Sequence, residues 1–135
     1  VFGALSEVTS LPITTAVTCP TVRIHPAVVA QAAATAAVQC QGGFTLGVGS
    51  GEALNEHIFG DPWPSAPQRL EMLEEAVEVM RGLWRDEPLT FEGKYFRTKE
   101  AVSLPRPLHW PGPSMFRPKR RRWRGVSGPG RSRSS

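Results

Sequence analysis

The sequence has few of the residues that stabilise disulfide-rich or metal-binding domains. It contains only two cysteines, Cys19 and Cys40, which are too few for a disulfide framework and match no metal-binding spacing. Glu56 and His57 lack the i, i+4 partner that a zinc-binding helix requires. We therefore expect a cytoplasmic protein with reduced thiols and no metal.

Long apolar runs are also absent. No stretch approaches the roughly 20 residues of a membrane span, and the start of the chain lacks a signal-peptide pattern, so no membrane partner is expected. The first residue is Val1 rather than Met, which suggests that sequence precedes it. The 135 residues are too few for a complete eight-stranded β/α barrel, which needs about 250.

Acidic residues are missing from one part of the chain. Residues 105–135 contain 9 basic and no acidic residues, whereas residues 1–104 contain 12 acidic and 7 basic residues, a net charge of −5. The second part is rich in Pro, Gly and Ser and has too few apolar side chains to offset the entropy of ordering. We predict a domain over 1–104 and a disordered tail over 105–135.

The first half of the domain has the pattern of a βαβ unit. A β-branched run over 13–19 predicts a buried strand. Pro26 then begins a helix that runs through Val38 and is apolar all round, which is typical of a buried helix. A second apolar strand is predicted over 44–49, and connections of this length join parallel strands.

The second half begins with a short helical turn in a polar loop. Ser65 and Gln68 have the spacing of a capping box that opens a long amphipathic helix. Its glutamates are interpreted as a solvated face. Gly93 lies between two short apolar runs, which predicts a hairpin over 89–97, and a further strand is possible over 101–104.

A glycine-rich segment, Gly47–Glu56, follows the second predicted strand. Glycines there allow a ligand to approach the backbone, and free amides at a helix start attract anions. The spacing matches neither the dinucleotide fingerprint nor the Walker motif. From spacing alone, a tight turn and a ligand loop are equally good interpretations.

The segments 16–32 and 44–56 strongly resemble the luciferase-like flavin and deazaflavin oxidoreductases. Within that superfamily they are most similar to the branch related to coenzyme F420-dependent glucose-6-phosphate dehydrogenase, and the likeness runs over residues 1–104. It implies an α/β fold, namely part of a TIM (β/α)8 barrel: about strands 3 and 4 with their helices and an insertion hairpin.

The same resemblance implies the site residues, position by position. Ala16 and Val17 match a strand-end dipeptide that is often a non-proline cis peptide against the cofactor ring. Glu52 matches the catalytic carboxylate that transfers a proton beside the hydride step. The remaining cofactor-binding positions implied by the resemblance are Cys19, Ser50, Gly51 and Asn55; a small buried thiol is an equally good interpretation of Cys19.

Other polar and aromatic residues are interpreted without catalytic roles. His25 precedes Pro26 and is expected to start a helix. Trp63 and Trp84 suit packing. The segment 39–43 departs from the family's usual turn, and the family's catalytic His and phosphate-binding Lys and Arg have no counterpart in this sequence.

The resemblance implies an oxidoreductase that transfers hydride between an organic substrate, a sugar phosphate or an alcohol, and coenzyme F420, in a full-length parent that is a homodimer. The fragment alone is expected to be inactive. An FMN-dependent monooxygenase is the alternative within the family.

Two other hypotheses concern the basic tail. Arginines interleaved with Trp123 over 119–124 could bind nucleic acid, although specific binding is not expected without a folded motif. Alternatively, residues 105–135 are an out-of-frame translation of a GC-rich gene.

Overall fold

A computed structural model describes residues 1–56, 58, 60–105 and 114–116. Three parallel strands form a sheet in the order β1-β2-β5: β1 spans Ile13–Thr14, β2 spans Phe44–Gly47 and β5 spans Ser114–Phe116. An antiparallel hairpin, β3 (Leu89–Glu92) and β4 (Arg97–Ala101), forms a second sheet. The helices are α1 (Phe2–Ser6), α2 (Pro26–Gln39), α3 (Ala53–Glu56) and α4 (Ala66–Leu83).

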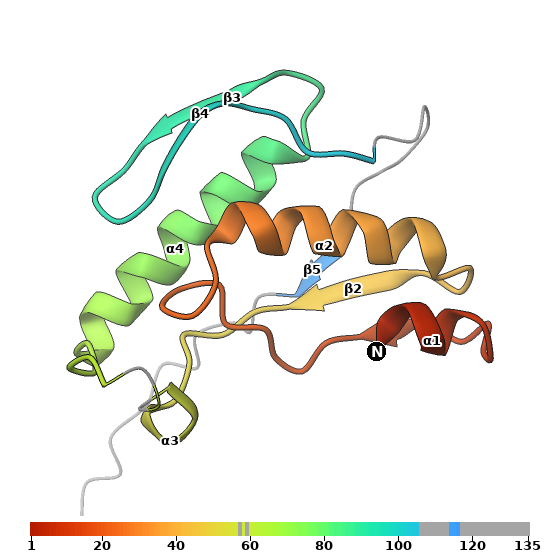
Figure 1. The fold of residues 1–135 in the computed structure, drawn as a ribbon, viewed down its shortest axis with the longest axis horizontal. Helices are drawn as coiled ribbons and strands as arrows, with labels where there is room; N and C mark the ends of the chain where they lie inside the picture. The colour runs from red at the N-terminus through yellow and green to blue at the C-terminus, as the bar shows by residue number, and fades with distance from the viewer. Residues whose placement is uncertain (57, 59, 106–113, 117–135) are drawn as a thin grey trace, which may run out of the picture.

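These elements are stacked in layers (Figure 1). Helix α2 packs on β2, α4 packs on α2, and the hairpin packs on α4. The predicted βαβ unit is confirmed, because α2 connects β1 to β2 and the two strands are parallel, with Ile13 opposite Phe44. The α/β class is confirmed, and so is the presence of the hairpin, although its second strand begins at Arg97 and runs to Ala101 instead of ending at 97.

The core lies mainly between α2 and α4. Ala30 and Ala34 on α2, and Ala76, Val79 and Met80 on α4, have no exposed surface. Small alanines on both helices let the two backbones approach closely. The Trp84 indole donates its Nε1–H to the carbonyl of Ala30 at 3.1 Å, so the end of α4 is attached to α2, and the predicted packing role of Trp84 is confirmed.

Two predictions about burial are wrong. The first predicted strand is buried only in part, because β1 ends at Thr14 and no described strand pairs with its outer edge. The alanine-rich helix is not buried all round either, since Val28 and Val38 are 56% and 50% exposed. The neighbouring elements β2, α4 and α1 cover only part of the circumference of α2, so these two valines remain exposed.

Only residues 105 and 114–116 of the predicted tail lie among the described residues. Residues 114–116 form β5, paired in parallel with β2, so the predicted disorder over 105–135 is wrong for these three residues. The further strand suggested over 101–104 is also wrong, because β4 ends at Ala101. The arginine-rich segment 119–124 lies outside the described residues.

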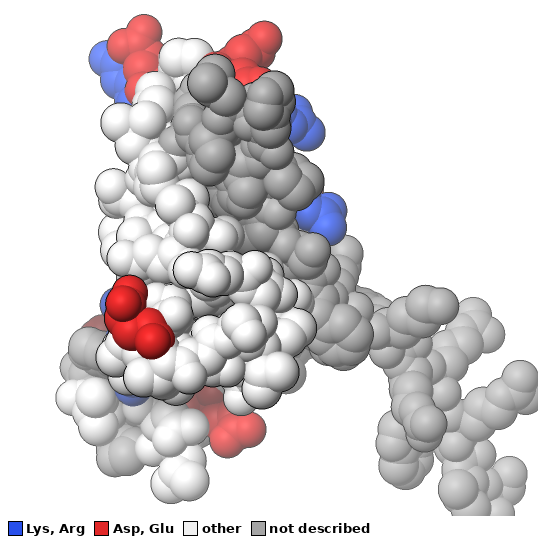
Figure 2. Space-filling model, turned by 90° about the vertical axis from the view of Figure 1, so that its right-hand side faces the viewer, with Lys and Arg blue, Asp and Glu red and all other residues white. Residues whose placement is uncertain are grey.

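Charged side chains are unevenly distributed over the molecule. Between Glu7 and Glu52 the sequence contains only one charged residue, Arg23. Figure 2 accordingly shows a face with few charged side chains on the side where α1 and the end of α2 lie. Among the described residues, most of the acidic and basic ones belong to α4, the hairpin and the turn between them.

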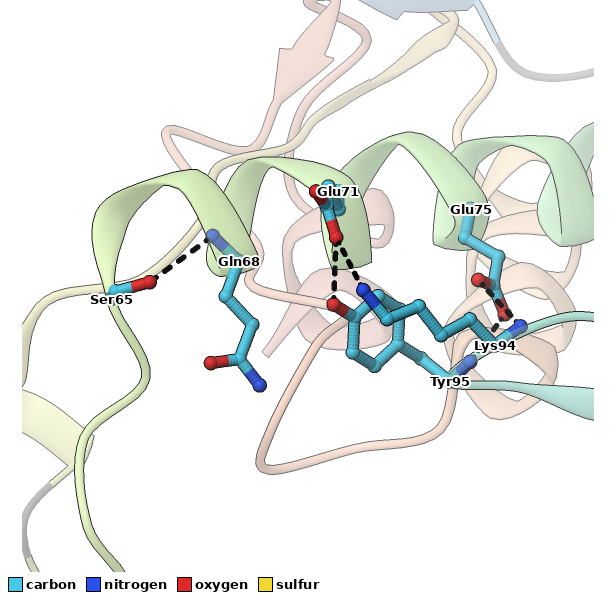
Figure 3. A network of polar contacts seen from close by, with 6 residues as sticks. All are labelled: Ser65, Gln68, Glu71, Glu75, Lys94 and Tyr95. Atoms are coloured by element: carbon cyan, nitrogen blue, oxygen red, sulfur yellow. Dashed lines mark hydrogen bonds and ion pairs between the residues drawn. The ribbon is translucent and has the colours of Figure 1, made fainter.

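The N-terminus of α4 is capped as predicted. Ser65 is the N-cap residue and its hydroxyl accepts a hydrogen bond from the Gln68 amide at 3.5 Å (Figure 3). Further along the helix, two glutamates bind the hairpin instead of forming only a solvated face, so that interpretation is wrong for them. The sequence pattern gives no sign of this, because the partner groups, side chains for Glu71 and backbone amides for Glu75, lie in a distant turn.

Glu75 attaches the hairpin turn to α4. Its carboxylate accepts three backbone N–H groups, from Lys94 at 3.1 Å, Tyr95 at 2.9 Å and Phe96 at 2.6 Å. Glu71, one helical turn earlier, accepts from the Lys94 ammonium at 2.9 Å and from the Tyr95 hydroxyl at 2.8 Å (Figure 3). The ammonium, followed by the hydroxyl, holds the pKa of Glu71 below its ordinary value.

We predict that Glu75→Gln destabilises the chain by about 1–3 kcal/mol, because the amide loses one acceptor and the charge that strengthens the hydrogen bonds. Urea unfolding measures the loss, and amide exchange at Tyr95 and Phe96 locates it. Glu78→Gln on the exposed side of the same helix is the control. An equal loss in both variants would contradict the assignment.

The Glu71 contact predicts a pH dependence. A carboxyl whose folded pKa is lowered contributes stability that is complete above the unfolded pKa and is lost as pH falls through the folded pKa. Urea unfolding should therefore give the unmodified chain a higher free energy of unfolding than Glu71→Gln. This advantage should be constant near neutrality and disappear well below pH 4.5, the ordinary pKa of the carboxyl group. Added salt should reduce this advantage, since both side chains are exposed; an advantage unchanged in strong acid would contradict this.

Candidate functional site

The candidate site lies at the carboxyl ends of β1 and β2. Past β1 the segment 16–19 continues beside β2, and the backbone bonds continue with it: Thr18 N–H donates to the Gly47 carbonyl at 2.7 Å, and Gly49 N–H donates to the Thr18 carbonyl at 3.0 Å. Thr18 and Val48 thus pair as an isolated parallel bridge. This pairing places the two strand ends side by side.

The dipeptide Ala16-Val17 forms one wall of the site. Its peptide bond is cis, as the resemblance predicts. The Val17 side chain is 61% exposed, which is unusual for a large apolar residue at the end of a strand. An exposed apolar wall of this kind can contact a flat ring.

Glycines form the base of the opposite wall because side chains would not fit there. A Cβ on Gly47 would lie 2.1 Å from the Thr15 carbonyl oxygen, and one on Gly49 would lie 2.9 Å from Val17 Cγ2. Gly51 has φ of 80°, a conformation that other residues adopt at a cost. The glycine-rich segment therefore permits both the close strand approach and the turn into α3.

These two walls enclose an open cleft of about 440 Å³. All the residues predicted for the site line it, so the structure brings the whole predicted set together. The lining is Ala16, Val17, Cys19, Gly49, Ser50, Gly51, Glu52 and Asn55.

The cleft combines an apolar wall with a polar rim. Ser50 and Gly51 are half-buried, whereas Glu52 and Asn55 are exposed. Glu52 directly precedes α3, and Asn55 lies in that helix. Cys19 is half-buried and lines the cleft, which fits a residue near a ligand and does not fit a fully buried thiol. The arrangement suits a flat, partly polar ring with a carboxylate beside it.

Arg23 holds α3 in place, and sequence reasoning did not identify it. Its guanidinium, from the loop before α2, donates to the backbone carbonyl of Asn55. The same loop thus carries Cys19, which lines the cleft, and Arg23, which binds the backbone of Asn55 on the opposite side of the cleft. The one available signal is that Arg23 is the only charged residue between Glu7 and Glu52.

The remaining candidates lie elsewhere. His25 is the N-cap of α2, and its Nδ1 accepts from the Ala27 amide at 3.1 Å, so its predicted role is confirmed. Trp63 stacks under the Arg69 guanidinium at 4.9 Å. Among the described residues no group of three or more His, Cys, Asp or Glu could hold a metal ion, and none of the described helices has the length and hydropathy to span a bilayer.

Comparison with known proteins gives one family. The sequence model of the luciferase-like monooxygenases matches residues 1–118. The match extends past residue 104, where we expect the resemblance to end, so that boundary is wrong; β5 explains part of the extension.

Individual relatives agree with this match. The F420-dependent glucose-6-phosphate dehydrogenase of Microbacterium testaceum is 46% identical over 106 residues, which are 78% of this chain and 32% of that protein. The counterpart from Intrasporangium calvum is 49% identical over 96 residues, 69% of this chain and 29% of that protein. The chain thus spans about a third of the length of these curated relatives.

Solved structures show the same fold. An F420-dependent secondary alcohol dehydrogenase in complex with an F420-acetone adduct is 43% identical with a TM-score of 0.75, over 80% of this chain and 33% of that one. A monooxygenase from Streptomyces bottropensis is 26% identical with a TM-score of 0.72, over 84% and 34% of the two chains.

The tight strand approach predicts that Gly47→Ala destabilises the chain by about 3 kcal/mol or more, because the methyl group must displace backbone instead of a flexible side chain. Urea unfolding measures this. Gly3→Ala is the matched control, since Gly3 lies in α1, where alanine is favoured and the nearest atom is 3.4 Å away. Equal stability of the two variants would contradict the described strand approach.

Proposed function

The chain belongs to the family of luciferase-like monooxygenases, and on this premise we propose that it is part of a (β/α)8-barrel oxidoreductase that transfers hydride between an alcohol-type substrate and coenzyme F420. In this proposal β1 and β2 are the third and fourth barrel strands, and the hairpin is an insertion. Half of the cofactor site lies in this chain. The chain alone is expected to be inactive.

The observation that carries the proposal is the cleft between the two strand ends. Active sites of β/α barrels lie at the carboxyl ends of the strands, and this cleft lies at the carboxyl ends of β1 and β2. Its base is a cradle that a Cβ at Gly49 would fill, 2.9 Å from Val17. The apolar wall and polar rim fit a deazaflavin ring, whose faces are apolar and whose edge carries hydrogen-bonding groups.

Different residues of the cleft are proposed for cofactor binding and for proton transfer. Ala16 and Val17 would contact one face of the ring and exclude water from it. Ser50, Gly51 and Asn55 would hold its polar edge, with Cys19 beside them in the lining of the cleft. When bound, F420 supplies a ring that accepts or returns the hydride.

Glu52 is proposed as the catalytic residue. When an alcohol becomes a carbonyl, hydride leaves the carbon with its electron pair and a proton leaves the hydroxyl oxygen. Glu52 lines the cleft and is exposed, so its carboxylate can take that proton and release it to water. Positioned general acid–base groups of this kind contribute about 10²–10⁴-fold to rate.

The substrate class follows from what the relatives share. One set is named for glucose 6-phosphate and another for a secondary alcohol, and both compounds present a C–H beside a hydroxyl. We therefore propose a sugar phosphate or a secondary alcohol as substrate of the parent protein. A cytoplasmic, homodimeric parent remains a prediction.

An FMN-dependent monooxygenase is the second candidate. The match to a monooxygenase of similar fold favours it, although the relatives of higher identity are F420-dependent. Nucleic-acid binding by the segment 119–124 has no supporting observation in the described residues.

A chimera tests the proposal. Residues 1–104 would replace the matching segment of the Microbacterium testaceum dehydrogenase, which supplies the rest of the barrel. We expect the folded chimera to bind F420 more tightly than FMN and to reduce F420 with glucose 6-phosphate or 2-propanol. Tighter binding of FMN, with oxygen-dependent turnover, would favour the monooxygenase.

In the same chimera, Glu52→Gln should lower kcat about 100-fold or more while F420 binding changes little, because the amide keeps its size and loses its proton-accepting oxygen. Glu7→Gln, on the residue that caps the end of α1, is the control and should leave kcat unchanged. Equal kcat in both variants would remove Glu52 from the proposed chemistry.

A further inference from the structure

The hydroxyl of Thr15 lies between the two strands just below the cleft. Its Oγ1 donates to the Gly47 carbonyl at 3.0 Å and accepts from the Gly47 N–H at 2.9 Å. The hydroxyl proton thus binds the Gly47 carbonyl, and an oxygen lone pair accepts the Gly47 N–H, so both backbone groups of Gly47 are bound by one side chain.

This hydroxyl occupies a position in the ladder that backbone would normally fill. Thr15 N–H donates to the Thr45 carbonyl at 3.1 Å, and a regular parallel ladder would continue with Gly47 N–H donating to the Thr15 carbonyl. Instead the Gly47 N–H binds the Thr15 side chain.

The interruption has a geometric cause in the two strands. From Thr15 to Thr18 the first strand advances one residue more than the second does from Leu46 to Val48, yet both ends remain paired. The extra residue is accommodated at Ala16-Val17, which bulges into the cleft. Bulges of this kind redirect side chains next to sites.

We propose that Thr15 is a positioning residue for the cleft: its hydroxyl holds Gly47 where the ladder is interrupted, and this fixes the distance between the Ala16-Val17 wall and the Gly49-Ser50 wall. The statement that this distance suits a flat cofactor rests on the function proposed above. Thr15 does not line the cleft and contacts no proposed ligand.

The rest of the Thr15 side chain packs away from the cleft. Thr15 also lines a mostly apolar cavity of about 150 Å³ between α1, α2 and the sheet, together with Phe2, Val28 and Phe44. Valine has the shape of threonine and would fill the same space. Thr15→Val therefore removes the hydroxyl alone.

The experiment compares three variants of the full chain. Thr15→Val lacks the hydroxyl, Thr15→Ser retains it, and Thr14→Val changes the exposed neighbouring threonine of β1. Amide hydrogen exchange is measured at Thr18, Gly47 and Gly49. We expect about tenfold faster exchange at all three amides in Thr15→Val, and rates within about twofold of the unmodified chain in the other two variants.

Unchanged exchange in Thr15→Val would overturn the proposal, as would equal acceleration in Thr14→Val. If Thr15→Val does not fold, Thr15→Ala and Thr15→Ser are compared in the same way. Only the serine variant should keep the three amides protected, and equal protection in both would overturn the proposal.

Titration with F420 separates this inference from the proposed function. If the unmodified chain binds F420, Thr15→Val should bind about tenfold more weakly and Thr15→Ser almost normally; equal affinity in the valine variant would overturn the positioning role. If no variant binds F420 but exchange changes as expected, the positioning role is supported and the cofactor proposal loses support for this chain.

Discussion

The parallel pairing of residues 13–18 with residues 44–49 is the constraint on which the rest of the structure depends. It joins two segments separated by one helix, so the connection is local in the sequence. Because both strands run the same way, their ends meet at one edge. The cleft exists only because the pairing continues past β1, through Thr18 and Val48.

A second layer stabilises this unit from behind. Helix α4 covers α2 through alanine, valine and methionine, and Glu75 attaches the hairpin through three backbone amides. A carboxylate suits this position because a turn exposes successive N–H groups that no strand partner satisfies. Gly93 leaves room for it, since a Cβ there would lie 2.0 Å from Glu75 Oε1.

Sequence reasoning was most successful where the pattern is local. The helix that begins at Pro26, the Ser65 cap and the hairpin around Gly93 all follow from adjacent residues. The site residues came from resemblance, since the spacing of the glycines alone could not distinguish a turn from a ligand loop. The contacts of Thr15, Arg23 and Glu75 could not be predicted, because each joins a side chain to backbone groups at least 19 residues away.

The near absence of charge between Glu7 and Glu52 makes the described part of the molecule amphiphilic. The charged residues gather on α4 and the hairpin, whereas the side where α1 and the end of α2 lie shows few of them (Figure 2), and Val28 and Val38 of α2 are exposed. At an air–water boundary or on an alkyl-bearing resin, the chain would adsorb through the α1–α2 end with its charged end in solution. Sulfate, which strengthens apolar association, would increase this oriented adsorption.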